Sequence, residues 1–297
     1  MTSPIAHASE SDRLALEKDD LLVVRYPRVS GGGFAANLTL GLFGALFATP
    51  LLWMLLSSID SHASWSIGVP TLTASNYAAI FHEAEMRPLL NSMYLAGVST
   101  GVTTVSAVLS AYVLSRRHVP LRRVFLVFIL FASGLPVTMV IVPTFQLFVT
   151  FHWLDSLFWT SLFLAASSLP FAIWLMKNFI DAVPEELEES AEIEGASSLR
   201  ILLRIIIPLT IPGIGVTAIV TFINGWGAFL IPLVLNSNPS DTPASIAAYN
   251  FLSAFTTPKF GQLAAYSLLF SLPVLVLYLV MARRLSGAFS FGGSLRG

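Results

Sequence analysis

The most informative part of the chain is also its most acidic. It reads Pro184-Glu-Glu-Leu-Glu-Glu-Ser-Ala-Glu-Ile-Glu-Gly195-Ala-Ser-Ser-Leu-Arg-Ile-Leu-Leu-Arg-Ile-Ile-Ile-Pro208. Proline suits the first position of a helix, and glutamates in the first turn complement the positive end of the helix dipole. We therefore predict a short acidic helix that begins at Pro184 and is ended by Gly195. Ser197 can cap a second helix, which leads to Pro208.

Uncharged apolar runs lie on both sides of this segment. The chain of 297 residues is 55 % hydrophobic and 11 % charged, whereas soluble domains average about 25 % charged. This composition argues against a soluble globular enzyme and excludes a disordered chain. A membrane span needs about 20 residues, and six runs are long enough: 34–56, 91–115, 124–151, 156–176, 209–235 and 263–281. We therefore predict an all-α membrane protein with six transmembrane helices.

Basic residues between the runs predict the orientation. Fourteen of the sixteen Lys and Arg residues lie in the N-terminal tail, the connections after the second and fourth runs, and the C-terminal tail. The other two, Arg87 and Lys259, lie in the remaining connections. By the positive-inside rule the fourteen are cytoplasmic, and so are both termini. We divide the chain into a cytoplasmic tail (1–30), whose role stays open, and a transmembrane domain (31–297).

Residue types that several kinds of chemistry require are missing from the sequence. No run contains a charged residue, which weighs against a proton- or sodium-driven transporter. The chain has no Gly-x-x-x-x-Gly-Lys-Ser/Thr phosphate loop, no His-Glu-x-x-His zinc motif and no cysteine. We therefore expect no enzymatic activity, no bound metal and no cofactor. A net charge of −1 without a basic bias predicts no nucleic-acid partner.

Two interpretations of the acidic helix are open. It is either a solvated loop helix, or a helix that docks into a basic or polar cleft on a cytoplasmic protein. Six glutamates within residues 185–194 lie where anionic lipid would repel them. Small residues, Ala191 and Gly195, stand among them. Both features favour close approach by another protein.

The segment that starts at Glu189 resembles the EAA loop of permease subunits in binding-protein-dependent ABC importers. That pattern is Glu-Ala-Ala, three residues, Gly, nine residues, Ile, two residues, Pro. The chain keeps this spacing through Gly195, Ile205 and Pro208. It departs from the pattern twice: a serine follows Glu189, and a glutamate stands before Gly195 where aspartate is usual.

Other stretches are similar to the maltose-type sugar permeases. They include Ala111-Tyr-Val-Leu-Ser-Arg116 at the end of the second run and Leu169-Pro-Phe-Ala-Ile-Trp174 in the fourth. The resemblance covers roughly residues 34–297. It implies the type I ABC importer permease fold and a role as half of a translocation pathway for an oligo- or disaccharide or a related sugar. An importer for a non-sugar solute (glycerol-phosphate, polyamine) and a stand-alone secondary transporter or channel are the alternatives.

The resemblance also implies partners and a place in the cell. These are a second permease, usually a different chain, a cytoplasmic ATPase dimer that binds ATP and Mg, and an extracytoplasmic binding protein, assembled in the bacterial cytoplasmic (inner) membrane. Residues 181–208 would form the coupling loop on the ATPase. Its contact residues are expected to be Glu188, Glu189, Ala191, Glu192, Glu194, Gly195 and Ala196.

A substrate path is expected along the fifth run. Asn224 offers a hydrogen-bond donor and an acceptor for sugar hydroxyls, while Trp226 and Phe229 offer flat apolar faces for a sugar ring. The segment is similar to a family segment with a Trp-Asn pair, although Gly227 stands in place of that asparagine. Alternatively, the aromatic residues pack against the second permease, and Gly225 and Gly227 permit close approach of the helices. The resemblance also allows that one permease of the pair carries all the sugar contacts and that this chain holds none.

Two prolines of the third run are further candidates. Pro136 and Pro143 are seven residues apart and lie close to one helix face. Proline removes a backbone donor and bends a helix. They either kink an ordinary span or line the same path, where a cavity can satisfy the freed carbonyl groups.

Overall fold

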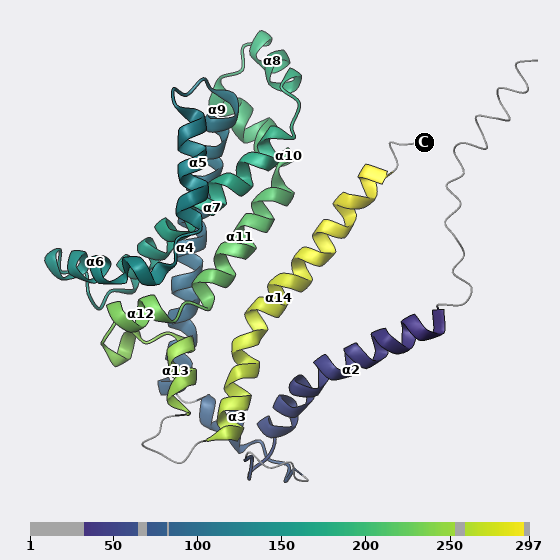
Figure 1. Cartoon of the computed structure of the whole chain (residues 1–297), viewed down its shortest axis with the longest axis vertical. Helices are drawn as coiled ribbons and strands as arrows, with labels where there is room; N and C mark the ends of the chain where they lie inside the picture. The colour runs from purple at the N-terminus through teal and green to yellow at the C-terminus, as the bar shows by residue number, and fades with distance from the viewer. Residues whose placement is uncertain (1–32, 65–69, 82, 253–258, 294–297) are drawn as a thin grey trace, which may run out of the picture. The chain divides into compact units, whose positions relative to one another are not determined.

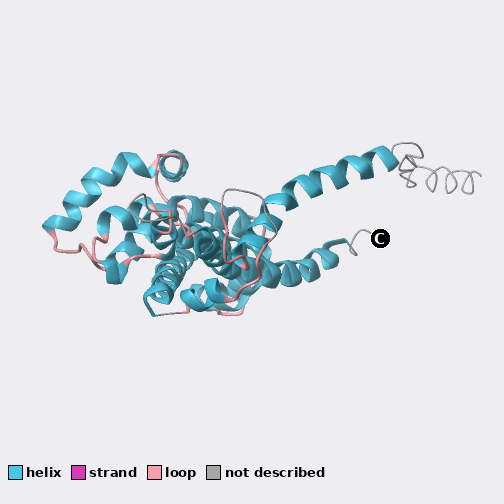
Figure 2. Ribbon diagram, turned by 90° about the horizontal axis from the view of Figure 1, so that it is seen from below, coloured by secondary structure: helices cyan, strands magenta, loops and turns pink. Residues whose placement is uncertain are grey.

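The computed structural model describes residues 33–64, 70–81, 83–252 and 259–293. Within these ranges the regular structure is helical, apart from one isolated bridge between Asp60 and Leu72. Figure 2 shows these helices joined by loops and turns. The all-α prediction is thus confirmed for the described residues, whereas the predicted tail 1–30 lies outside them.

Four long helices match four of the predicted spans. They are α2 (Gly33–Ser58), α4 (Glu83–Arg116), α7 (Leu157–Asp181) and α14 (Phe260–Gly293). Each contains a stretch long and apolar enough to cross a membrane. The shortest, α7, has 25 residues, and at about 1.5 Å per residue it exceeds a hydrocarbon core of about 30 Å.

The predicted span 124–151 is wrong as a single helix. It is divided into α5 (Arg122–Ser133) and α6 (Val137–Thr150), which meet at an angle of 94°. Gly134 follows the end of α5, and Pro136 precedes α6 with an extended backbone (φ −61°, ψ 129°). Since proline has no N–H and disfavours a helical conformation in the residue before it, α5 cannot continue through this point.

The predicted span 209–235 is also broken. The chain passes through α9 (Ser198–Ile201), a π-helical turn (Leu202–Ile206) and α10 (Ile207–Leu209), then bends by 77° into α11 (Ile211–Trp226). Pro208 and Pro212 flank this bend and cannot donate backbone hydrogen bonds. A second break after Trp226 separates α12 (Leu230–Leu235). The described residues therefore contain four uninterrupted spans, or up to six if each bent pair counts as one.

Helices α4, α7 and α11 pack against one another and form the centre of the unit that comprises residues 53–297 (Figure 1). Small residues make the contact surfaces: Ala107 and Ala111 of α4 and Ala172 of α7 are buried. Gly225 of α11 lies so close to Ala96 that a Cβ on the glycine would be 3.0 Å from the Ala96 Cα. Small side chains let helix backbones approach closely, which is how helices associate in lipid.

Two groups of short elements lie at opposite ends of these helices (Figure 1). One end carries α8 (Glu186–Ile193). The other carries α12, a 3-10 turn (Pro239–Asp241) and α13 (Ala244–Asn250). The short helix α3 (Ser75–Ile80) lies near that second end.

Candidate functional site

The acidic helix α8 is one candidate site. It spans Glu186–Ile193, and Glu185 takes the position before its first residue. The prediction that Pro184 is the first helical residue is therefore wrong by two positions. The amides of Glu188 and Glu189 both bond to the Glu185 carbonyl, so the first turn closes on Glu185 instead of on the proline.

Gly195 ends α8 as predicted, and the geometry shows how. Its φ is +85°, a conformation that L-residues with a side chain rarely adopt. The Gly195 amide bonds to the Glu192 carbonyl at 2.9 Å, and the Ala196 amide bonds to the Ala191 carbonyl at 2.9 Å. This pair of bonds is a Schellman motif, which satisfies helix carbonyls that have no partner within the helix.

The predicted contact residues of the loop divide into outward and inward groups. Glu189, Glu192, Glu194 and Gly195 are exposed. Ala191 and Ala196 are half-buried and pack against the apolar cluster formed by α4, α7 and the 201–206 turn. Glu188 is 7 % exposed, so in this structure it does not face solvent.

Glu188 instead forms an ion pair with Arg116, at the C-terminal end of α4. Its second carboxylate oxygen accepts a hydrogen bond from the Tyr112 hydroxyl at 3.2 Å. From the sequence, Arg116 is a cytoplasmic basic residue within the stretch 111–116 that is similar to the sugar permeases, and nothing there indicates its pairing with Glu188. The adjacent glutamates thus have different surroundings, Glu188 inside the protein and Glu189 outside it.

Ile193 is a surface residue that the sequence analysis missed. Its side chain is 88 % exposed at the end of α8, and Leu187 on the same helix is 46 % exposed. Single apolar side chains are common on protein surfaces, but these two share a short helix with the predicted contact residues Glu189 and Glu192. An isoleucine placed between glutamates was the available signal.

A cavity of about 740 Å³ is the second candidate site. It is bounded by the junction of α5 and α6, by α7 and by the end of α11. Among its lining residues are three of the predicted path residues, Pro136, Asn224 and Phe229. The lining also includes four hydroxyl side chains and two further aromatic rings: Ser133, Ser167, Ser168, Thr221, Phe163 and Phe171. Most of the remaining lining residues are aliphatic. We call this hollow the polar cavity. Such a mixture of polar groups and flat apolar faces suits a polyhydroxylated ligand.

The other two predicted path residues lie elsewhere. Trp226 is 3 % exposed, and its indole N–H donates to the Phe270 carbonyl of α14 at 2.9 Å. Its ring stacks on Phe222 and Phe270, so it joins α11 to α14. Pro143 lies within α6 and does not line the cavity.

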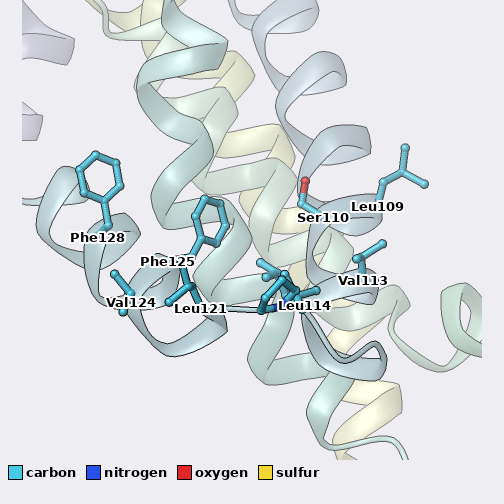
Figure 3. A pocket seen from close by; sticks show the side chains of 10 residues that line it. Leu109, Ser110, Val113, Leu114, Leu121, Val124, Phe125 and Phe128 are labelled. Carbon is cyan, nitrogen blue, oxygen red and sulfur yellow. The ribbon is translucent and has the colours of Figure 1, made fainter.

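A groove of similar size, about 730 Å³, has a different chemistry. Figure 3 shows Leu109 and Val113 of α4 near Val124 and Phe125 of α5. The only polar side chain in its lining is Ser110. The groove and the cavity have nearly equal volumes, but their lining residues differ. The groove offers few hydrogen-bonding groups to a sugar and suits an apolar neighbour. Among the described residues, no three His, Asp or Glu side chains are grouped to hold a metal ion.

Comparison with known proteins identifies the family. Residues 103–287 match the family described as "Binding-protein-dependent transport system inner membrane component", and they make up more than half of the chain. The chain belongs to this family. It is a permease subunit of a transport system, with several helices that can span a membrane. The matched region includes α8, Gly195 and most of the residues that line the polar cavity.

Individual relatives cover most of the permease. The sulfoquinovosyl glycerol transport system permease protein SmoH of Agrobacterium fabrum is 30 % identical over 256 residues, which are 82 % of this chain and 87 % of that protein. The diacetylchitobiose uptake system permease protein NgcG of Streptomyces coelicolor is 29 % identical over 84 % of this chain and 85 % of its own length.

A solved structure supports the fold. A chain of a bacterial ABC transporter involved in the import of the acidic polysaccharide alginate superposes with a TM-score of 0.75, over 93 % of this chain and 98 % of that one. The two sequences are 21 % identical, so this likeness shows the fold alone. It confirms that the permease has an ABC importer fold.

Proposed function

We propose that this permease forms half of the translocation pathway of a bacterial ABC importer for an oligo- or disaccharide or a related sugar. The relatives named for sulfoquinovosyl glycerol and for diacetylchitobiose favour a carbohydrate. An extracytoplasmic binding protein delivers the sugar, and a second permease, usually a different chain, supplies the other half of the pathway. The complex lies in the cytoplasmic (inner) membrane.

The exposed surface of α8 is the observation that carries this proposal. Four predicted contact residues, Glu189, Glu192, Glu194 and Gly195, are exposed together with Ile193. A short acidic surface that also exposes Ile193 fits a basic cleft with an apolar pocket for this isoleucine. In the proposal that cleft belongs to a cytoplasmic ATPase, which binds ATP and Mg itself. Movement of the ATPase dimer pushes α8 and so opens and closes the pathway.

The polar cavity is the proposed sugar path. Asn224 is exposed, and its side-chain amide group makes no hydrogen bond within the described residues. This group is therefore available to a sugar hydroxyl. Phe229 offers a ring face, and Pro136 creates the turn between α5 and α6 that helps to bound the cavity. Trp226 does not line the path, but its contact with α14 holds in place the end of α11, which does.

In the proposed topology each bent pair counts as one span, which gives six spans and places both termini in the cytoplasm. The fourteen basic residues on one side of the six runs support this arrangement. The end of the helix bundle that carries α8 is then cytoplasmic, and the end that carries α13 is extracytoplasmic.

Charge reversal at Glu189 tests the proposal. We expect the ATPase to co-purify with the native chain from detergent-solubilised membranes, and Glu189→Lys to lose both the ATPase and the uptake of labelled sugars. Asp241→Lys, the same charge change at the other end of the bundle, is the control and keeps the ATPase. If no ATPase co-purifies and Glu189→Lys transports normally, the chain works alone. Labelled glycerol phosphate, included in the same uptake assay, tests the non-sugar alternative.

A further inference from the structure

Arg116 is an arginine with protein partners on all three of its nitrogen atoms. Its side chain is 7 % exposed. Nε donates to Glu188, and Nη2 donates to the carbonyl groups of Ile180 at 3.0 Å and Val183 at 2.7 Å. Nη1 donates to the Ser115 hydroxyl at 3.2 Å and lies 3.6 Å from a carboxylate oxygen of Glu185. A guanidinium has five N–H donors in a rigid fork, so it can bind several acceptors at once in one fixed arrangement.

These contacts connect three helices. Arg116 is the last residue of α4, Ile180 and Val183 flank the C-terminal end of α7, and Glu188 belongs to α8. Helix C-terminal ends carry carbonyl groups without helical partners and a partial negative charge, which a cation stabilises. One side chain therefore binds the end of α7 and the acidic helix to α4.

Glu188 is the main side-chain attachment of α8. Both of its carboxylate oxygens are occupied, one by Arg116 and one by the Tyr112 hydroxyl. Ala191 adds a half-buried apolar contact, and the other side chains of α8 are exposed. Force applied to the exposed face of α8 must therefore pass to the bundle largely through Glu188.

The residue that follows α4 contacts the other side of the loop. Arg117 donates from Nη2 to the Ser198 hydroxyl, 2.6 Å away, at the start of α9. Unlike Arg116, Arg117 is exposed, and its contact is a single hydrogen bond. It is therefore a matched neighbour against which the effect of losing Arg116 can be measured.

We propose that Arg116 is a positioning residue for energy coupling: its pair with Glu188 makes α8 move as one rigid body with α4 and α7. This rests on the proposed docking of α8 on an ATPase. Glu189 and its exposed neighbours would receive the movement, and Arg116 and Glu188 would pass it to α4 and to α7, which lines the cavity. Without the pair, α8 could still bind the ATPase, but its displacement would be absorbed locally.

The variants must remove the pair without leaving a charge buried alone, which is strongly destabilising. Arg116→Met combined with Glu188→Leu removes both charges at once, and Arg117→Met is the matched control. In the reconstituted importer we expect the double variant to keep its bound ATPase while the ATP hydrolysed per sugar transported rises severalfold, because α8 no longer passes its full displacement to α4 and α7. Arg117→Met should leave this ratio near that of the native protein.

A distance measurement separates transmission from simple stability. Because the chain has no cysteine, spin labels can be placed at Ser190→Cys on α8 and Val105→Cys on α4, both exposed positions. With Arg116 present, we expect the same distance distribution without nucleotide and with ATP bound. In the double variant the distribution should shift or broaden with ATP.

Three outcomes would overturn the role of Arg116. They are a distance that already changes in the Arg116 protein, a normal ATP-to-sugar ratio in the double variant with the ATPase still bound, and loss of the ATPase from the double variant alone. In each of these cases the docking of α8 on the ATPase still stands. A native chain that binds no ATPase overturns both proposals.

Discussion

At the scale of single residues, the backbone at Gly195 controls how α8 ends. No atom lies within 4 Å of a Cβ placed on this glycine, so Gly195→Ala causes no clash. The φ of +85° still costs an L-residue about 1–2 kcal/mol. We expect the alanine variant to fray the end of α8 and to reduce sugar uptake, measured together with hydrogen exchange of residues 189–196. Gly195→Asn is the control, because asparagine tolerates this conformation better; equal results for the two variants would contradict the backbone explanation.

Gly225 is required for a different reason, close packing between α4 and α11. A Cβ at this position would lie 2.6 Å from the Ser99 hydroxyl oxygen and 3.0 Å from the Ala96 Cα. We expect Gly225→Ala to lower the free energy of unfolding by about 1–3 kcal/mol, the usual cost of overpacking. Thermal unfolding in detergent measures the loss. Gly97→Ala on α4 is the control, since nothing lies within 4 Å of its added Cβ, and it should unfold near the native temperature.

At the scale of elements, Asp155 fixes the segment that follows α12. It lies between α6 and α7 with a φ of +56°, and its carboxylate accepts hydrogen bonds from the amides of Ser237 at 2.6 Å and Asn238 at 2.9 Å. Bonds to a charged acceptor contribute about 1.5–3 kcal/mol each. We expect Asp155→Ala to speed hydrogen exchange at these two amides. Asp155→Asn keeps an oxygen acceptor and tolerates positive φ but loses the charge, so its exchange rates should lie between those of the native protein and the alanine variant; rates as fast as in the alanine variant would assign the whole effect to charge.

Local sequence predicts most of the helices and helix ends, but not the direction of the turns between them. Hydropathy identifies α2, α4, α7 and α14 because a helix in lipid needs apolar residues along its whole length. The acidic helix and its end at Gly195 follow from local rules for helix termini. A bend at Pro136 follows from the rules for proline, but its size of 94° does not, because apolar composition does not encode the direction in which the chain continues.

The inner parts of the site depend on contacts between residues far apart in the chain. Arg116 is buried because it meets Glu188, 72 residues later; counted alone, it is one more cytoplasmic basic residue. By composition Trp226 fits a sugar path or packing against the second permease equally well, and neither predicts its contact with Phe270 of the same chain, 44 residues later. The exposure of the other glutamates of α8 follows from their own charge and does not depend on a partner far along the chain. It is therefore easier to predict from the sequence.

At the scale of the whole molecule, the proposed topology puts α8 and the segment after α12 on opposite sides of the membrane. Because the sequence contains no cysteine, single introduced thiols can test on which side each segment lies. Ile193→Cys, at a position 88 % exposed, should react with a membrane-impermeant maleimide in inside-out vesicles from which the ATPase has been removed, and should stay unlabelled in spheroplasts. Ser237→Cys, also at an exposed position, should show the reverse pattern.

The same thiol connects topology to coupling. If α8 docks on an ATPase, bound ATPase should shield Ile193→Cys in inside-out vesicles, and removal of the ATPase by a chaotropic wash should restore labelling. Ser237→Cys serves as the control, because its labelling should not depend on the ATPase. Labelling of both thiols from one side would refute the six-span arrangement, since an odd number of crossings must separate the loop after the fourth span from the one after the fifth. Labelling from opposite sides without shielding would keep the topology and refute the docking surface.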